Sequence, residues 1–166
     1  LFVVTLGVIA IILVTLIRWI EHLSRLGRVG ETSELVEGVT EMALLERARE
    51  PYLGANPLVD RELDIPENAV PVRSDQTGNI QYIDIEKLDH LSRDRDLDLY
   101  VVSLPGDFVS VTSVLVYADK PVSNETRRDL LGAFIIGHER NFEQDPRFGL
   151  CVLAEIAARA LSAAVN

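Results

Sequence analysis

Residues 1–20 have the sequence LFVVTLGVIAIILVTLIRWI, and this apolar run dominates the architecture of the chain. No residue before Arg18 is charged. At the rise of an α-helix, twenty residues extend about 30 Å, which matches the hydrocarbon core of a bilayer. Arg18 and Trp19 then follow at the level of a membrane interface, where a guanidinium and an indole are both favoured. The run therefore predicts a transmembrane helix over residues 1–20.

A signal peptide and a buried core helix are the alternatives for this run. A signal peptide carries its basic residues before a shorter apolar stretch and ends at a small-residue cleavage site. Here the basic residues follow the run, and no Ala-x-Ala pattern occurs. The chain also begins without methionine. We therefore expect a fragment of a larger membrane region, with further spans before residue 1.

Charge divides the chain into two parts. Residues 1–30 carry three bases and one acid, whereas the remainder carries thirteen bases and twenty-five acids. The net charge of the whole chain is −10. Basic flanks mark the cytoplasmic side of a span, so Arg18, Arg25 and Arg28 predict a cytoplasmic location for the downstream part. An acidic domain repels nucleic acid and anionic lipid alike, and we expect no nucleic-acid partner.

Cys151 is the only cysteine of the chain and lies in an apolar helical pattern. A single cysteine allows no disulfide framework within the chain. We interpret it as a small buried hydrophobic side chain, in agreement with a reducing compartment.

A linker helix is expected after the membrane edge. The segment 21–50 has apolar residues at helical spacing, and Thr32 or Ser33 can serve as an N-cap. Gly27 and Gly30 weaken this pattern and predict a kink or break near the membrane. Such a helix either leads the chain away from the bilayer or packs on a second copy.

A small mixed β module is expected next. The segments 70–73 and 80–83 alternate on either side of a turn cluster, which predicts a β-hairpin. Asp84 predicts the N-cap of a short helix that ends at Arg95. Further strand patterns flank the Pro-Gly-Asp turn at 105–107.

The last third predicts a helical hairpin. Ser123 or Asn124 can cap a helix that extends to about Glu139. Asp145 followed by Pro146 then predicts the start of a second helix, because proline is favoured at the first helical position. This second helix keeps its apolar spacing to the end of the chain.

Polar side chains gather in this predicted hairpin and are the candidate ligand-binding residues. They are Arg140, Gln144, Asp145, Arg159, Ser162 and Asn166. An arginine beside carboxylates and amides is suited to an anion or another polar ligand. The alternative is structural, with Asp145 as a helix cap and Glu155 paired with Arg159 at i,i+4 spacing.

The sequence contains no phosphate-binding loop, dinucleotide fingerprint or nucleophile elbow. His138 lacks the second histidine of a zinc-binding helix. Asp94, Asp96 and Asp98 lack the glycine and the glutamate that complete a calcium-binding loop. We therefore expect no catalytic residue, no metal site and no cofactor.

Four motifs carry a resemblance to a known family. They are GHERNFEQD at 137–145, EIAARALS at 155–162, QYID at 81–84 and PGDFV at 105–109. Together they resemble the bacterial family of predicted membrane proteins called domain of unknown function 2254. Its members show Gly-x-x-Arg-Thr-x-x-Gln-Asp, then Arg-Ala-Leu-Ser-Pro. This chain departs from that pattern with Asn141 for threonine, Ala163 for proline, and Thr112 where glycine is common.

The resemblance implies several upstream membrane helices, with residues 1–20 as the last span, in a bacterial inner membrane. It also implies that the family's C-terminal part is missing after Asn166. It implies no known activity.

These observations predict an α+β chain in three parts. A transmembrane helix (1–20) is followed by a linker helix with a connecting loop (21–65). A cytoplasmic α+β domain (66–166) then comprises a small mixed β module with one short helix and a C-terminal helical hairpin, truncated at its end. The expected partners are the lipid bilayer and a second copy of the chain, through the membrane and linker helices.

The favoured function is a non-enzymatic regulatory or assembly domain of an integral membrane protein, such as one associated with transport. One alternative is a membrane-bound enzyme or a small-ligand sensor that uses the polar residues of the hairpin. Another is a purely structural oligomerisation domain.

Overall fold

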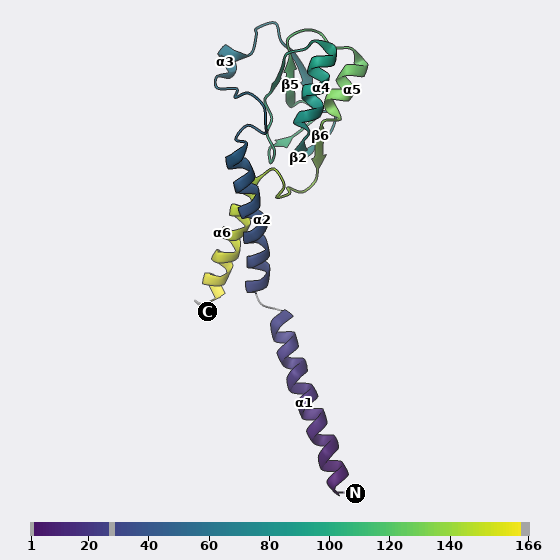
Figure 1. Ribbon diagram of the computed structural model, residues 1–166, viewed down its shortest axis with the longest axis vertical. Coiled ribbons are helices and arrows are strands. Elements are labelled where there is room, and N and C mark those ends of the chain that lie inside the picture. The colour runs from purple at the N-terminus through teal and green to yellow at the C-terminus, as the bar shows by residue number, and fades with distance from the viewer. Residues whose placement is uncertain (1, 27–28, 164–166) are drawn as a thin grey trace. The chain divides into compact units, whose positions relative to one another are not determined.

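The computed structural model describes residues 2–26 and 29–163 (Figure 1). This described part contains six helices and two small antiparallel sheets, so the fold is mixed α+β, as predicted. It divides into two compact units, and the boundary along the chain lies between Leu35 and Val36. The domain boundaries predicted at residues 20 and 65 stay predictions.

Helix α1 (Phe2–Leu26) begins the first unit and contains the apolar run. Its described apolar side chains, from Phe2 to Ile20, are exposed on every face of the helix. Within the described residues, none of the helices combines the length and the hydropathy that a membrane crossing requires. This finding corrects the predicted span over residues 1–20.

Helix α2 (Val29–Arg49) lies where the sequence predicts a linker helix, and most of it belongs to the second unit. The predicted N-cap at Thr32 or Ser33 is wrong, because both residues lie inside the helix. Thr40 and Ala43 on one of its faces are buried. A turn follows it, in which Leu53 and Gly54 both have positive φ. A single helical turn, α3 (Arg61–Asp64), comes next.

Six strands form the two sheets. They are β1 (Val70–Arg73), β2 (Gly78–Ile83), β3 (Leu99–Val101), β4 (Phe108–Val109), β5 (Val114–Ala118) and β6 (Phe134–Gly137). The first sheet has the order β1-β5-β3 and the second β4-β2-β6, with antiparallel neighbours throughout.

The predicted hairpin between 70–73 and 80–83 is wrong, because β1 and β2 lie in different sheets. The amide of Ser74 donates to the carbonyl oxygen of Ser113 at 2.9 Å, so the chain still lies beside the start of β5 when β1 ends. It then enters the second sheet instead of turning back on β1. Sequence alternation indicates a strand but does not specify its partner.

Helices α4 (Ile85–Arg95) and α5 (Asn124–Leu131) pack against one another beside the sheets (Figure 1). The predicted cap Asp84 accepts from the amide of Lys87, and Ser123 accepts from that of Thr126. The core that sheets and helices share is apolar. It contains Val72, Ile80, Ile83, Leu88, Val109, Leu115, Val116, Leu130, Ala133 and Phe134.

The predicted C-terminal helical hairpin is also wrong. Helix α5 stops at Leu131, and the next residues form β6, in which Phe134 is buried and pairs with Ile83. A short apolar run suits a buried strand as well as a helix, and here the edge of β2 supplies the hydrogen-bond partners.

Helix α6 (Pro146–Ala163) therefore has a different helical neighbour, α2 (Figure 1). Gly149 lies so close to it that an added Cβ would be 2.1 Å from Oγ1 of Thr40. Cys151, which we expected to be buried, is exposed on this helix. Helical spacing alone does not say which apolar positions face a neighbour.

Gly78 provides a test of this sheet arrangement. An added Cβ there would be 2.5 Å from the backbone oxygen of Gly137 in β6. We expect Gly78→Ala to lower the free energy of unfolding by about 1–3 kcal/mol, because backbone atoms would have to move. The matched control is Gly38→Ala in α2, where an added Cβ meets nothing within 4 Å. It should stabilise the helix by about 0.5–1 kcal/mol. Denaturant unfolding in mild detergent measures both, and a neutral Gly78→Ala would contradict the pairing.

Candidate functional site

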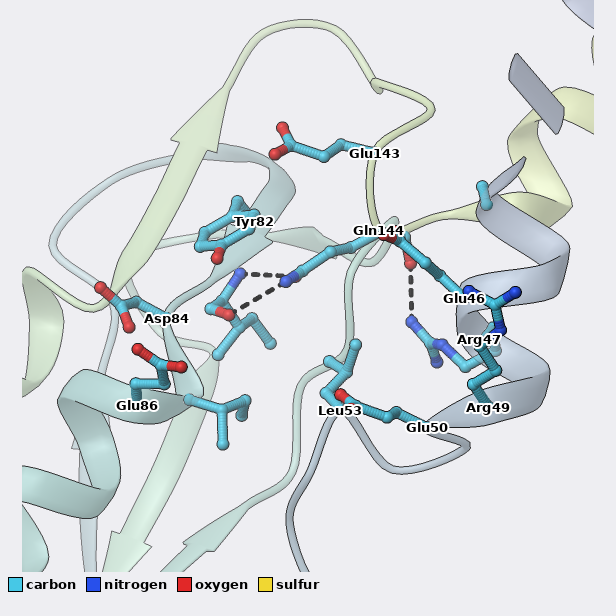
Figure 2. A pocket seen from close by; sticks show the side chains of 13 residues that line it. Glu46, Arg47, Arg49, Glu50, Leu53, Tyr82, Asp84, Glu86, Glu143 and Gln144 are labelled. Carbon is cyan, nitrogen blue, oxygen red and sulfur yellow. Dashed lines mark hydrogen bonds between the residues drawn. The ribbon is translucent and has the colours of Figure 1, made fainter. Parts of the chain in front are cut away.

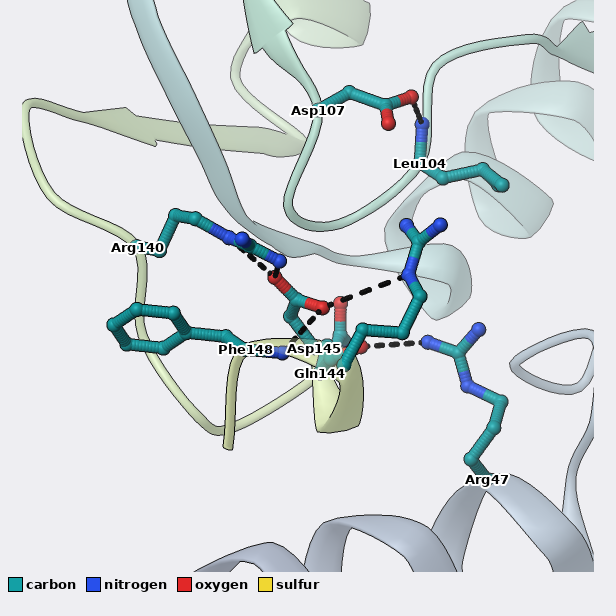
Figure 3. Close-up of polar contacts among 8 residues, drawn as sticks. Arg47, Leu104, Asp107, Arg140, Gln144, Asp145 and Phe148 are labelled. Atoms are coloured by element: carbon teal, nitrogen blue, oxygen red, sulfur yellow. Dashed lines mark hydrogen bonds and ion pairs between the residues drawn. The ribbon is translucent and has the colours of Figure 1, made fainter. Parts of the chain in front are cut away.

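The structure brings three of the six predicted ligand residues together, namely Arg140, Gln144 and Asp145 at the start of α6 (Figure 3). Arg159 and Ser162 are exposed further along α6, more than about 20 Å from Asp145 at the helical rise. Asn166 lies outside the described residues. The ligand-binding role of the whole set stays a prediction.

Asp145 is the centre of this group, and its side chain is only 2% exposed. Arg140 donates to its Oδ2 atom from Nε at 2.8 Å and also from Nη2. The amide of Phe148 donates to its Oδ1 atom at 3.3 Å. Asp145 is therefore a helix cap, as predicted, and one half of a charged pair at the same time.

Arg140 is held from a second side by aromatic rings. Its guanidinium carbon lies 5.0 Å from the centroid of the Phe148 ring, within the range of a cation–π contact. The Phe148 ring in turn lies 4.8 Å from that of Phe142. The side chain of Arg140 remains 29% exposed, so its charge is accessible from one side.

The Pro-Gly-Asp turn contacts the same carboxylate. Gly106 has a φ of 90°, and an added Cβ would be 2.2 Å from Oδ2 of Asp145. The turn is joined to β2 by two backbone hydrogen bonds, from Gly106 to Ile80 at 2.8 Å and from Ile80 to Asp107 at 2.9 Å. Two motifs that are far apart in the sequence therefore meet at Asp145. Each is recognisable in the sequence, but their contact is not.

Gln144 binds the backbone of β2 with both atoms of its amide (Figure 2). Its Oε1 accepts from the amide of Ile83 at 2.8 Å, and its Nε2 donates to the carbonyl of Ile83 at 3.2 Å. Its own carbonyl accepts from Nη2 of Arg47 at 2.7 Å. Gln144 thus links the last strand residue of β2 to α2.

Two further arginines, which the sequence did not single out, complete the group. Nε of Arg147 lies 3.9 Å from Oδ1 of Asp145. The half-buried Arg47 reaches the same region from α2. Burial lowers the pKa of Arg47, and the charge of Arg147 lowers it further, while Asp145 raises it. Arg47 is separated from Gln144 by 97 positions, so no local pattern could have indicated it.

A polar pocket of about 550 Å³ lies next to this group (Figure 2). It is lined by the end of α2, the junction of β2 with α4, and the loop before α6. Its charged lining residues are Glu46, Arg47, Arg49, Glu50, Asp84, Glu86 and Glu143. Arg47 and Gln144 belong to the lining, whereas Arg140 and Asp145 do not. Within the described residues, no group of three or more histidine, cysteine and acidic side chains is placed to hold a metal ion.

Comparison with known proteins identifies the family. The family model described as "Predicted membrane protein (DUF2254)" matches residues 1–166. The chain belongs to this family. The resemblance found in the sequence motifs is thereby confirmed, and the family is one of predicted membrane proteins of unknown function.

Two relatives from this comparison are uncharacterized mycobacterial proteins. One is from Mycobacterium bovis and the other from Mycobacterium tuberculosis, and each is 31% identical over 118 residues. The matched region covers 64% of this chain but only 22% of each relative. No solved structure matches the chain.

The charged pair can be tested by replacing its buried member. Asp145→Asn keeps the shape and a capping oxygen but removes the charge that Arg140 faces. We expect the free energy of unfolding to fall by about 2–4 kcal/mol, because a partly buried guanidinium loses its partner.

The matched control is Glu155→Gln, which breaks the exposed pair with Arg159 on the same helix. It should change stability by no more than about 0.5 kcal/mol. Denaturant unfolding of both variants measures the difference. Equal effects of the two substitutions would contradict the central place of Asp145.

Proposed function

We propose that this chain is a non-enzymatic regulatory or assembly domain of a membrane protein. Its second unit would face the cytoplasm at a bacterial inner membrane, and the proposal includes association with transport. The observation that carries this proposal is that polar atoms at the start of α6 form hydrogen bonds with other groups of the same chain. Asp145 and Gln144 direct their side-chain oxygens at Arg140, Phe148 and Ile83 of the same chain. These hydrogen bonds join helices to sheets, as is expected of a domain that serves as a rigid connection.

The exposed surface of α2 supports an assembly role. Met42 and Leu45 are both exposed and lie three positions apart, on one side of the helix. The opposite side carries the buried Thr40 and Ala43. An apolar side that is exposed among the described residues is suited to contact with another helix, such as α2 of a second copy.

The membrane association rests on the family and on α1. A helix with apolar side chains on every face is stable only when lipid or other protein covers it. The basic residues at 18, 25 and 28 support a cytoplasmic location for the chain downstream of them, because the cytoplasmic leaflet carries the anionic lipids that attract basic side chains.

Assembly is tested by Leu45→Glu in the full-length protein, studied in mild detergent by native mass spectrometry. We expect a smaller complex with an unchanged unfolding temperature, because the side chain is exposed in the isolated chain. The control is Leu63→Glu, the same chemical change on α3, where the side chain is also exposed. A complex of wild-type mass in Leu45→Glu would contradict assembly through α2.

Orientation is tested with Cys151, the single cysteine of the chain, which is exposed. Full-length protein that keeps no other cysteine is treated with a membrane-impermeant maleimide in intact spheroplasts. We expect labelling only after the membrane is permeabilised, and none in Cys151→Ser. Labelling of intact spheroplasts would place α6 outside the cytoplasm.

A second candidate function is that of a small-ligand sensor or an enzyme. It is favoured by the arginines near Asp145, because their combined positive charge exceeds the negative charge of the one carboxylate. A turnover by the full-length protein that is lost in Arg140→Ala would support the enzyme and contradict the non-enzymatic proposal.

A further inference from the structure

The charges around Asp145 do not balance. Arg140 and Arg147 both form ion pairs with this one carboxylate. Arg47 directs its guanidinium at a carbonyl oxygen, close enough to Arg147 for repulsion to lower its pKa. Two guanidiniums therefore pair with one carboxylate and a third lies near them, in a chain whose net charge is −10. Concentrated positive charge in an acidic protein requires a physical reason.

The three arginine side chains also have more N–H donors than these contacts use. A guanidinium carries five N–H groups. Arg140 directs two nitrogens at Asp145, and Arg47 directs one at the carbonyl of Gln144. Arg147 reaches Asp145 only at 3.9 Å, and its side chain is 67% exposed. Its planar end is thus available to a ligand that approaches from solvent.

The local backbone and packing favour an anion at the same place. Arg147 is the second residue of α6, and a helix of this length carries a partial positive charge at its N-terminus. Asp145 and the Phe148 ring hold Arg140 in a defined orientation. A positioned guanidinium loses little side-chain entropy when it binds. The site is therefore preorganised as well as positively charged.

The carboxylate-rich pocket and the apolar side of α2 are the competing candidates. The pocket carries five acidic side chains against two arginines, so it disfavours an anion. Arg140 and Arg147 do not belong to its lining, and Arg47 is the one arginine of the group that does.

We propose that Arg47, Arg140 and Arg147 bind a phosphate group at the start of α6, either as a free phosphate or as the headgroup of an acidic lipid. Tetrahedral phosphate oxygens accept the parallel N–H pairs of arginine in bidentate fashion. Asp145 then positions Arg140 and is not itself a ligand. The inference rests on the second candidate function, ligand sensing, and names its ligand class.

The test uses the full-length protein in phosphatidylcholine nanodiscs at low ionic strength, titrated with inorganic phosphate by calorimetry. We expect saturable binding in the wild type, weakened about ten-fold or more in Arg147→Gln. The control is Arg159→Gln, which makes the same charge change on the same helix and should leave the affinity unchanged. Arg147→Gln should also keep the wild-type unfolding temperature, because its side chain is largely exposed.

A second arm distinguishes the two sources of phosphate. The titration is repeated in nanodiscs that contain one-fifth phosphatidic acid. Unchanged binding assigns the site to free phosphate, and binding that the lipid abolishes in the wild type assigns it to a headgroup. Absence of phosphate binding in phosphatidylcholine discs, or equal weakening by Arg147→Gln and Arg159→Gln, would overturn the proposal. Such a result would leave the assembly role intact, because the Leu45→Glu experiment tests that role separately.

Discussion

The buried carboxylate of Asp145 joins the start of α6 and the loop before it to the Pro-Gly-Asp turn, which is distant in sequence. It caps α6 through the amide of Phe148 and pairs with Arg140 in the preceding loop. It also fills the space beside Gly106, where no Cβ would fit. A charge that is 2% exposed is costly unless every partner is in place. The start of α6 is therefore held in one position relative to the turn and to β2.

The neighbouring Gln144 extends this connection to α2. Its amide pairs with the backbone of Ile83, and its carbonyl receives Arg47. Through these two consecutive residues, α2 and α6 are both tied to the second sheet. The same arrangement gathers three arginines around a single acid. Structural connection and concentrated positive charge thus come from one set of contacts, and a phosphate at this place would act directly on the junction.

Local signals in the sequence were reliable where the physics is local. Asp84, Ser123 and Asp145 cap helices as expected, because a cap needs only a side-chain oxygen and an amide two or three residues away. Strand partners were not predictable, since alternation says which face is apolar and nothing about the neighbour. The apolar run at 134–137 is compatible with a helix as well as a strand, and it is a strand here because it pairs with β2.

The sequence by itself determined the family, the mixed α+β class and the starts of α4, α5 and α6. Each of these depends on residue identity and short spacing. Only the tertiary structure decided that Arg47 and Arg147 join Asp145, that Gly106 abuts it, and that Arg159 lies elsewhere. The reason is distance along the chain: Arg47 and Gln144 are 97 positions apart, and only the packing of helices on sheets brings such residues into contact.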